Sequence, residues 1–212
     1  MSVMLDLIGS SIVGGILILS ILRISAVGIE NRSYFVEDLS VQENLRNVIE
    51  IVEDDFRKIG YGATISQNGN FFMQNILLEG DTSKIKYCSD IHHDTINVPR
   101  TLDTITYWLG GSVLSTPNKD DRYLMRKENN QPAQAWSVGL VQFKLTFLNS
   151  AGDSIPVPLS FNDRAKVRLI RIAVKVQSQF LTKSMFEADS MGYKKRSAIW
   201  RESRLIARNL TQ

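Results

Sequence analysis

The 212-residue sequence has little cysteine, histidine or proline. Cys88 is its one cysteine, which excludes an internal disulfide framework and any metal site made of several cysteines, and which gives no guide to the redox compartment. Of the five prolines, none precedes Pro99. Because proline is the residue that most reliably breaks a helix, the first part of the chain is free to form a long one.

The chain also lacks a charge of one dominant sign. Its 25 lysines and arginines are mixed with 22 aspartates and glutamates, so the net charge is +3, and the longest basic run is Lys194-Lys195-Arg196. This excludes the basic stripe that a nucleic-acid-binding protein needs, and we predict no nucleic-acid partner. With 43% hydrophobic and 22% charged residues, the composition predicts one folded domain, or a smaller domain with an anchoring element.

An uncharged apolar run extends from Leu7 to Leu22, with the single carboxylate of Asp6 just before it. Together with residues 3–5 it reaches about 20 residues, which is the helical length that crosses a bilayer. A secretory signal peptide fits less well, because no basic residue precedes the run and no small-residue cleavage site follows it. The run contains small residues four apart, which favour close packing against a partner helix or are simply tolerated in a lone anchor: Ser10 with Gly14, and Ser11 with Gly15.

The helical pattern continues beyond the apolar run. Apolar residues at three- and four-residue spacing form a stripe that should be buried, namely Val36, Leu39, Leu45, Val48, Ile49, Val52, Phe56 and Ile59. The glycines of the sequence Gly60-Tyr61-Gly62 are the expected helix stop. The sequence therefore predicts one helix from about Val3 to Ile59, roughly 85 Å long at about 1.5 Å per residue, with a bend or linker near 28–33.

After Gly62 the pattern changes to the alternation typical of strands. The expected strands are Phe71–Leu78, Lys84–Cys88, Thr104–Leu109, Arg122–Lys127, Val141–Phe147, Lys166–Phe180 and Ala198–Leu210. Two of them alternate clearly, which should bury Val141, Phe143, Leu145 and Phe147 in one strand and Ile170, Ile172, Val174 and Val176 in the other. We predict an α+β fold: residues 1–30 form a transmembrane and assembly helix, 31–59 an amphipathic helix, and 63–212 an antiparallel sheet on which the amphipathic helix packs.

No catalytic or metal-binding motif is evident. His92 and His93 are adjacent, near Asp90 and Asp94, but they lack the spacing of a zinc signature, so a surface loop is the better interpretation. Asn149 and Asp153 surround a glycine and predict a hairpin turn, not a calcium loop. Cys88 has no local nucleophile signature. The sequence thus predicts no catalytic residue, no metal and no cofactor.

The order of these features resembles the type IV pilin-like proteins, within them the larger minor pilins and pseudopilins of the PilW-like and type II secretion J-like group. The resemblance lies in the apolar N-terminal helix, in the stretch "DDFRKIGYG" at the end of its amphipathic extension, and in the late strands "VRLIRIAVKVQS" and "RLIARNL". In this group an acidic residue, an arginine and a glycine-tyrosine-glycine turn close the long helix. Asp55, Arg57, Gly60, Tyr61 and Gly62 match that pattern here.

The resemblance implies a non-enzymatic subunit of a type IV pilus, or of the pseudopilus that serves protein transport in type II secretion. Its helix would lie in the inner membrane before filament assembly and then pack against other pilin or pseudopilin subunits, with the C-terminal domain extracytoplasmic. Family members carry a glutamate at the fifth mature position that pairs with a neighbour's amino terminus. Asp6 would be fifth if only Met1 were removed. By itself, the position of Arg23 and Arg32 after the apolar run would predict a cytoplasmic domain.

Three alternatives stay open on the residues alone. Asp6 could be stabilised by the helix dipole without any partner. The chain could be a membrane-anchored extracytoplasmic binding or sensor domain that uses the sheet as its binding face. More remotely, it could be a hydrolase that depends on His92 or His93.

Overall fold

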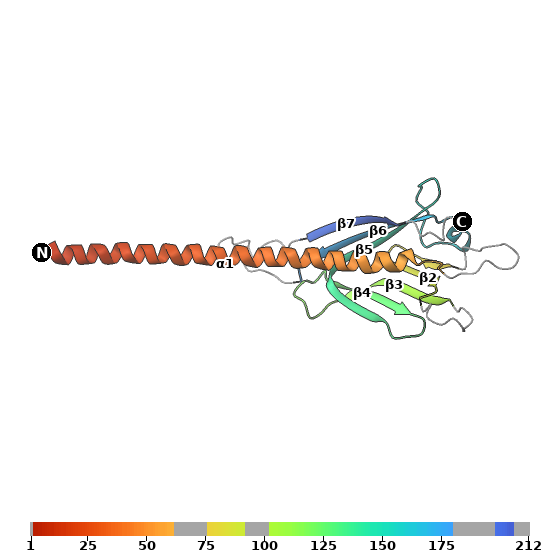
Figure 1. Ribbon diagram of the computed structural model, residues 1–212, viewed down its shortest axis with the longest axis horizontal. Helices are drawn as coiled ribbons and strands as arrows, with labels where there is room; N and C mark the ends of the chain where they lie inside the picture. Colours follow the sequence, from red (N-terminus) through yellow and green to blue (C-terminus); the bar gives the residue numbers. More distant parts are fainter. Residues whose placement is uncertain (1, 62–75, 92–101, 180–197, 206–212) are drawn as a thin grey trace.

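A computed structural model describes residues 2–61, 76–91, 102–179 and 198–205. One helix, α1 (Ser2–Arg57), accounts for the first quarter of the chain. Its second half packs on the sheet, and its first half projects away from the sheet as a straight rod (Figure 1). The bend or linker expected near 28–33 is wrong, because every residue of that stretch is helical and α1 continues straight through it (Figure 1).

The rest of the described chain forms a seven-stranded antiparallel sheet. Each strand pairs with the next along the chain, in the order β1-β2-β3-β4-β5-β6-β7. The strands are β1 (Leu77–Gly80), β2 (Lys84–Ser89), β3 (Asp103–Ser112), β4 (Arg122–Glu128), β5 (Gln134–Leu148), β6 (Leu169–Gln177) and β7 (Ala198–Leu205), with the short helix α2 (Phe161–Arg164) between β5 and β6. The α+β class and the antiparallel sheet predicted from the sequence are therefore confirmed. Residues 71–75, 180 and 206–210 of the expected strands lie outside the described residues.

β5 is much longer than expected and bends where its pairing changes. Its register shifts against β4 between Trp136 and Leu140, and against β6 between Leu140 and Gln142. Gly139 occupies the first irregularity with a φ of +74°, and a Cβ there would collide with the backbone oxygen of Gln177. Only glycine satisfies both conditions.

The second irregularity changes which residues face the core. Val141 has no partner in the ladder with β6, and it is half-buried where full burial was expected; Leu140, one residue earlier, is fully buried instead. The other predicted inward residues of β5 and all four of β6 are buried. A single inserted residue is enough to shift the alternation, because strand side chains repeat every second residue.

The core lies between the second half of α1 and the concave side of the sheet. In the view of Figure 1, β6 and β7 lie on one side of this half of α1 and β2–β4 on the other, and the long strand β5 connects the two sides. The helical stripe is buried from Leu45 to Ile59 as expected, and burial begins at Val41, which the sequence analysis missed. Val36 and Leu39 were expected to be buried but are 57% and 48% exposed, because α1 has already left the sheet at these positions.

Candidate functional site

From Leu7 to Leu22, the projecting half of α1 is apolar on every side. Ile16, Leu17, Ile18 and Leu19 are all exposed, and consecutive helical residues point about 100° apart, so no polar face exists there. Exposed large apolar side chains continue over the whole projecting part: Val3, Met4, Leu7, Ile8, Ile12, Val13, Ile16, Leu17, Ile18, Leu19, Ile21, Leu22, Ile24, Val27, Ile29, Phe35, Val36 and Leu39. Apolar surface of this extent is a site of contact with lipid or with other helices.

Within the described residues, one helix is long and apolar enough to cross a membrane. It is the Asp6–Arg57 part of α1, and none of its most apolar stretch is buried by the rest of the chain. Length and composition thus make α1 suitable as a single membrane anchor.

The predicted assembly residues Asp6, Ser10, Ser11, Gly14 and Gly15 all lie on this projecting part. The two serine hydroxyls donate to the Leu7 carbonyl, at 3.0 Å from Ser10 and 2.8 Å from Ser11, so they are satisfied without a partner helix. Apart from the neighbouring backbone of α1 itself, a Cβ on either glycine would meet no atom of the described residues within 4 Å. The chain's own packing therefore does not require glycine at these two positions.

Asp6 is exposed, and its carboxylate makes no hydrogen bond or ion pair within the described part of the chain. The first turn of α1, which begins at Ser2, contains no acidic residue.

At the other end of α1, the predicted stop is tied to the end of β2. Gly60 has a φ of +72°, the left-handed conformation expected of a glycine at a helix end, and its N–H donates to the Cys88 carbonyl at 2.9 Å. The Ser89 hydroxyl donates to the Lys58 carbonyl, and the Asp90 N–H donates to the Tyr61 carbonyl. Gly62 lies outside the described residues. The turn therefore holds the helix end at one fixed place on the sheet.

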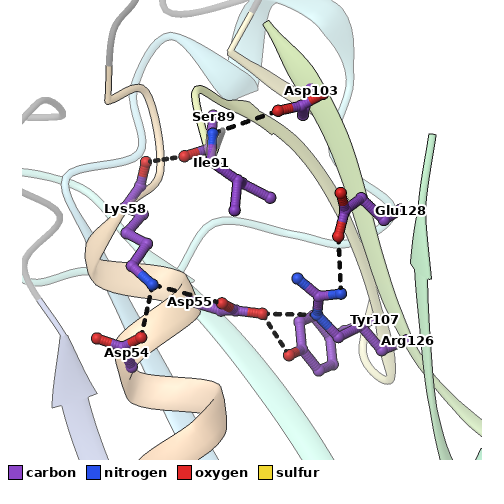
Figure 2. Close-up of polar contacts among 9 residues, drawn as sticks. All are labelled: Asp54, Asp55, Lys58, Ser89, Ile91, Asp103, Tyr107, Arg126 and Glu128. Atoms are coloured by element: carbon purple, nitrogen blue, oxygen red, sulfur yellow. Dashed lines mark hydrogen bonds and ion pairs between the residues drawn. The ribbon is translucent and has the colours of Figure 1, made fainter. Parts of the chain in front are cut away.

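A buried polar cluster, which we name the Asp55 cluster, joins the last turn of α1 to β3 and β4 (Figure 2). Oδ2 of Asp55 accepts hydrogen bonds from the Tyr107 hydroxyl at 2.6 Å and from Nε of Arg126 at 2.8 Å. Nη1 of Arg126 also donates to Glu128 at 3.1 Å. Asp55 is only 8% exposed, and both charges are thus largely removed from water but paired.

The electrostatics of this cluster keep the Tyr107 and Arg126 side chains protonated. Burial and then the negative charge of Asp55 raise the pKa of Tyr107 well above its ordinary value of 10, so the hydroxyl stays a donor. Burial alone would lower the pKa of Arg126, but the hydrogen bond and charge of Asp55 outweigh it and raise that pKa. The cluster therefore forms a permanent bridge between helix and sheet.

Sequence reasoning missed Asp55, Tyr107 and Arg126 as a group. A signal for Asp55 was present: it lies three residues after Val52 and four before Ile59, so it falls on the buried stripe of the helix. A carboxylate on such a stripe calls for a buried cation or donor. Which residues supply it depends on the pairing of Tyr107 with Arg126 across β3 and β4.

Within the described residues, the remaining chemical candidates form no assembled reactive site. His92, His93 and Asp94 lie outside the described residues; Asp90 is buried at the end of β2. The Asn149 side chain accepts from the N–H groups of Ala151 and Asp153, which confirms the expected turn. No group of three or more potential metal-ligating residues occurs in the ranges that the structure describes. Burial raises the pKa of the half-buried Cys88 thiol, which makes it a poor nucleophile.

Comparison with models of known protein families finds no match to this chain. Comparison with curated proteins finds no match either.

Proposed function

We propose that this protein is a non-enzymatic, pilin-like subunit that assembles through the projecting half of α1 into a type IV pilus-like or type II secretion pseudopilus filament, or into its tip complex. Before assembly, α1 anchors the chain in the inner membrane, and the sheet domain lies outside the cytoplasm. The observation that carries the proposal is a helix that is apolar on all sides from Leu7 to Leu22, projects far from its domain and continues into it without a break.

The exposed apolar surface is longer than an anchor requires. From Val3 to Leu39 it covers roughly 54 Å of helix at about 1.5 Å per residue, against a hydrocarbon core of about 30 Å. Phe35, Val36 and Leu39 lie beyond the charged residues Glu30 and Arg32 and are still exposed. Apolar side chains outside the bilayer are best covered by neighbouring helices, as in a filament core.

The helix is also held rigidly by its domain. A domain that only needs a tether can use a flexible linker, but α1 is helical through residues 28–33. Its end is fixed by the Asp55 cluster and by the bond from Gly60 to Cys88, and Glu53 accepts a hydrogen bond from Ser203 of β7 at 2.5 Å. Such rigidity lets the packing of the helices determine where each sheet domain sits in a filament.

Asp6, Gly14 and Gly15 fit a contact with a second helix. A carboxylate at the edge of a membrane-spanning run is costly to bring next to hydrocarbon unless it is paired, and the described part of this chain supplies no cation to Asp6. The two glycines leave space that a neighbouring backbone can occupy. The amino terminus of an adjacent subunit is a suitable cation for Asp6.

The test is the size of the complex formed by the tagged full chain, extracted from its native membrane in mild detergent. Asp6→Ala and Gly14→Leu should each reduce the fraction of the chain found in assemblies, while Val13→Leu, an apolar exchange at the neighbouring exposed position, should not. Circular dichroism of the purified variants checks that the sheet domain is still folded.

A wild-type chain that is always monomeric, or an Asp6→Ala variant that assembles normally, would contradict this function. A monomer that binds a ligand would instead support the anchored binding or sensor domain.

A further inference from the structure

An open groove with cationic walls lies where β4, β5 and β6 come together. Its volume is about 330 Å³. It is lined by Lys119 and Asp120 of the loop between β3 and β4, Arg122 of β4, Gln142 of β5, and Lys175 and Gln177 of β6. The unpaired residue of the β5 irregularity, Val141, forms part of the floor. We call it the cationic groove.

Within the described residues, the three cations of the groove outnumber its carboxylates. Lys119, Arg122 and Lys175 form no ion pair or hydrogen bond through their side chains within the described ranges. Among the residues that the structure describes, Asp120 is the one carboxylate that lines the groove. Three like charges beside a single carboxylate leave an excess of positive charge, which an external anion would neutralise.

The groove is built from fixed walls, because the loop that carries Lys119 and Asp120 is tied to the end of β6. Nδ2 of the buried Asn118 donates to the Ser178 carbonyl at 3.0 Å. Asp121 is completely buried behind the loop and does not line the groove; its Oδ2 accepts from the side chains of Thr116 and Gln179, each at 3.1 Å. The cationic side chains are therefore presented by a backbone that is already ordered.

The groove lies at the end of the domain from which α1 projects. Gln177 also lines a second groove, whose other wall is α1 itself at Ser33, Glu37 and Ser40. If α1 spans the bilayer from Leu7 to Ile29, a length of roughly 34 Å at about 1.5 Å per residue, the one charged side chain inside that span is Arg23, which can extend to the interface. Ser33 then lies about 6 Å beyond the hydrocarbon, at the level of the lipid headgroups, and the α1 wall of the second groove continues from there to Asn44, about 22 Å beyond it.

We propose that the cationic groove binds a phosphate oxyanion, and that the phosphate of an anionic phospholipid headgroup is its ligand. The Arg122 guanidinium can bind two phosphate oxygens at once, Lys119 and Lys175 add point charges, and the amides of Gln142 and Gln177 add neutral donors. The choice of a lipid headgroup as the ligand rests on the membrane anchoring in the proposed function, but not on filament assembly. A soluble phosphate compound offers the same chemical group, and the experiment below distinguishes it from the lipid.

The test reconstitutes the full chain into lipid nanodiscs and follows hydrogen exchange of the backbone amides at 140–143 and 174–177. One set of discs contains only zwitterionic phosphatidylcholine, and the other adds anionic phosphatidylglycerol. When the lipid headgroup is present at twice the dissociation constant of the groove, amides that exchange through local opening should exchange about threefold more slowly. The Arg122→Gln/Lys175→Gln variant should lose this protection, while Lys144→Gln, on the same strand as Gln142 but outside the groove, should keep it.

Inorganic pyrophosphate added to the phosphatidylcholine discs forms the second arm. Protection in anionic discs without pyrophosphate supports the headgroup, whereas protection only by pyrophosphate supports an oxyanion site with a soluble ligand. No protection in either arm, or equal loss in Lys144→Gln, would overturn the proposal. A chain that does not enter the discs would contradict the anchor and the headgroup together; loss of subunit association alone leaves the groove result unchanged.

Discussion

Nε of Arg126 in β4 donates a 2.8 Å hydrogen bond to Oδ2 of Asp55 in the last turns of α1, a contact between residues 71 positions apart in the sequence. Both side chains of this ion pair are nearly buried, with 14% of the Arg126 side chain and 11% of the Asp55 side chain exposed. The helix that serves as the candidate assembly element is thereby joined to the domain that it carries.

Removing one member of this ion pair should strongly destabilise the sheet domain. Arg126→Ala leaves the Asp55 carboxylate buried without its cation, and the expected loss is about 3–5 kcal/mol. The measurement is denaturant unfolding of the full chain in detergent, followed by tryptophan fluorescence, since Trp136 packs beside Tyr107 with ring centroids 6.4 Å apart. Arg46→Ala removes an exposed ion pair to Glu50 on the same helix and should leave the unfolding midpoint unchanged. Equal midpoints for the two variants would show that the Asp55 cluster does not hold the helix.

The core contact of α1 should be far more sensitive to truncation than its projecting part. Phe56 is fully buried and meets Tyr87 and Tyr107 edge to face, with centroids 5.7 and 5.6 Å away, so Phe56→Ala should cost about 3–5 kcal/mol. Leu39→Ala removes a half-exposed side chain and should not change the same unfolding curve. It should instead reduce subunit association in mild detergent. Destabilisation of the domain by Leu39→Ala would mean that the helix packs on the sheet earlier than Val41.

Gly139→Ala should destabilise the bend of β5 by about 2 kcal/mol or more, because its positive φ is unfavourable for alanine and the new Cβ would strike the Gln177 carbonyl. Gly111→Ala is the matched control: a Cβ there meets no atom within 4 Å, and the backbone is not in the left-handed region. Thermal unfolding of both variants makes the comparison. Similar unfolding temperatures would contradict the strained conformation at 139.

Stability should fall as the pH rises above 10. Burial raises the pKa of Tyr87 and of Tyr107, so the unfolded chain loses these two protons at a pH where the folded chain keeps them. The unfolded state then binds fewer protons, and each tyrosine lowers the free energy of unfolding by about 1.4 kcal/mol per pH unit above 10. Below pH 10 the two tyrosines therefore leave the free energy of unfolding unchanged, and above pH 10 their destabilising effect grows with pH.

The measurement is unfolding at pH 8 to 11, with phenolate absorbance as an independent record of ionisation. The slope of the free energy of unfolding against pH reports how many protons the unfolded chain has lost relative to the folded chain. Tyr107→Phe should reduce this number by about one, and Tyr87→Phe should do the same. The lysines that titrate in the same range contribute equally to wild type and variants, so the difference between the curves isolates the two tyrosines. A slope unchanged in both variants would show that these hydroxyls ionise without unfolding.

The sequence by itself determined the long helix and the class of the fold. Local interactions set the extent of the helix: no proline precedes Pro99, the run from Leu7 to Leu22 is uncharged, and a glycine stands at position 60. In the same way, the alternation of Ile170, Ile172, Val174 and Val176 determines which face of β6 is buried. These features depend on residues close in the chain, and periodicity reports them directly.

Only the tertiary structure decided where the helix meets the sheet and what binds it there. Val36 and Val41 look alike in the sequence, yet one is exposed and the other buried, because burial depends on where the sheet ends. The pairing of Asp55 with Arg126, the irregularity that replaces Val141 by Leu140 in the core, and the meeting of Arg122 with Lys175 at one groove depend on strand register over long separations. Register is set by the packing of the whole sheet, which no local pattern encodes.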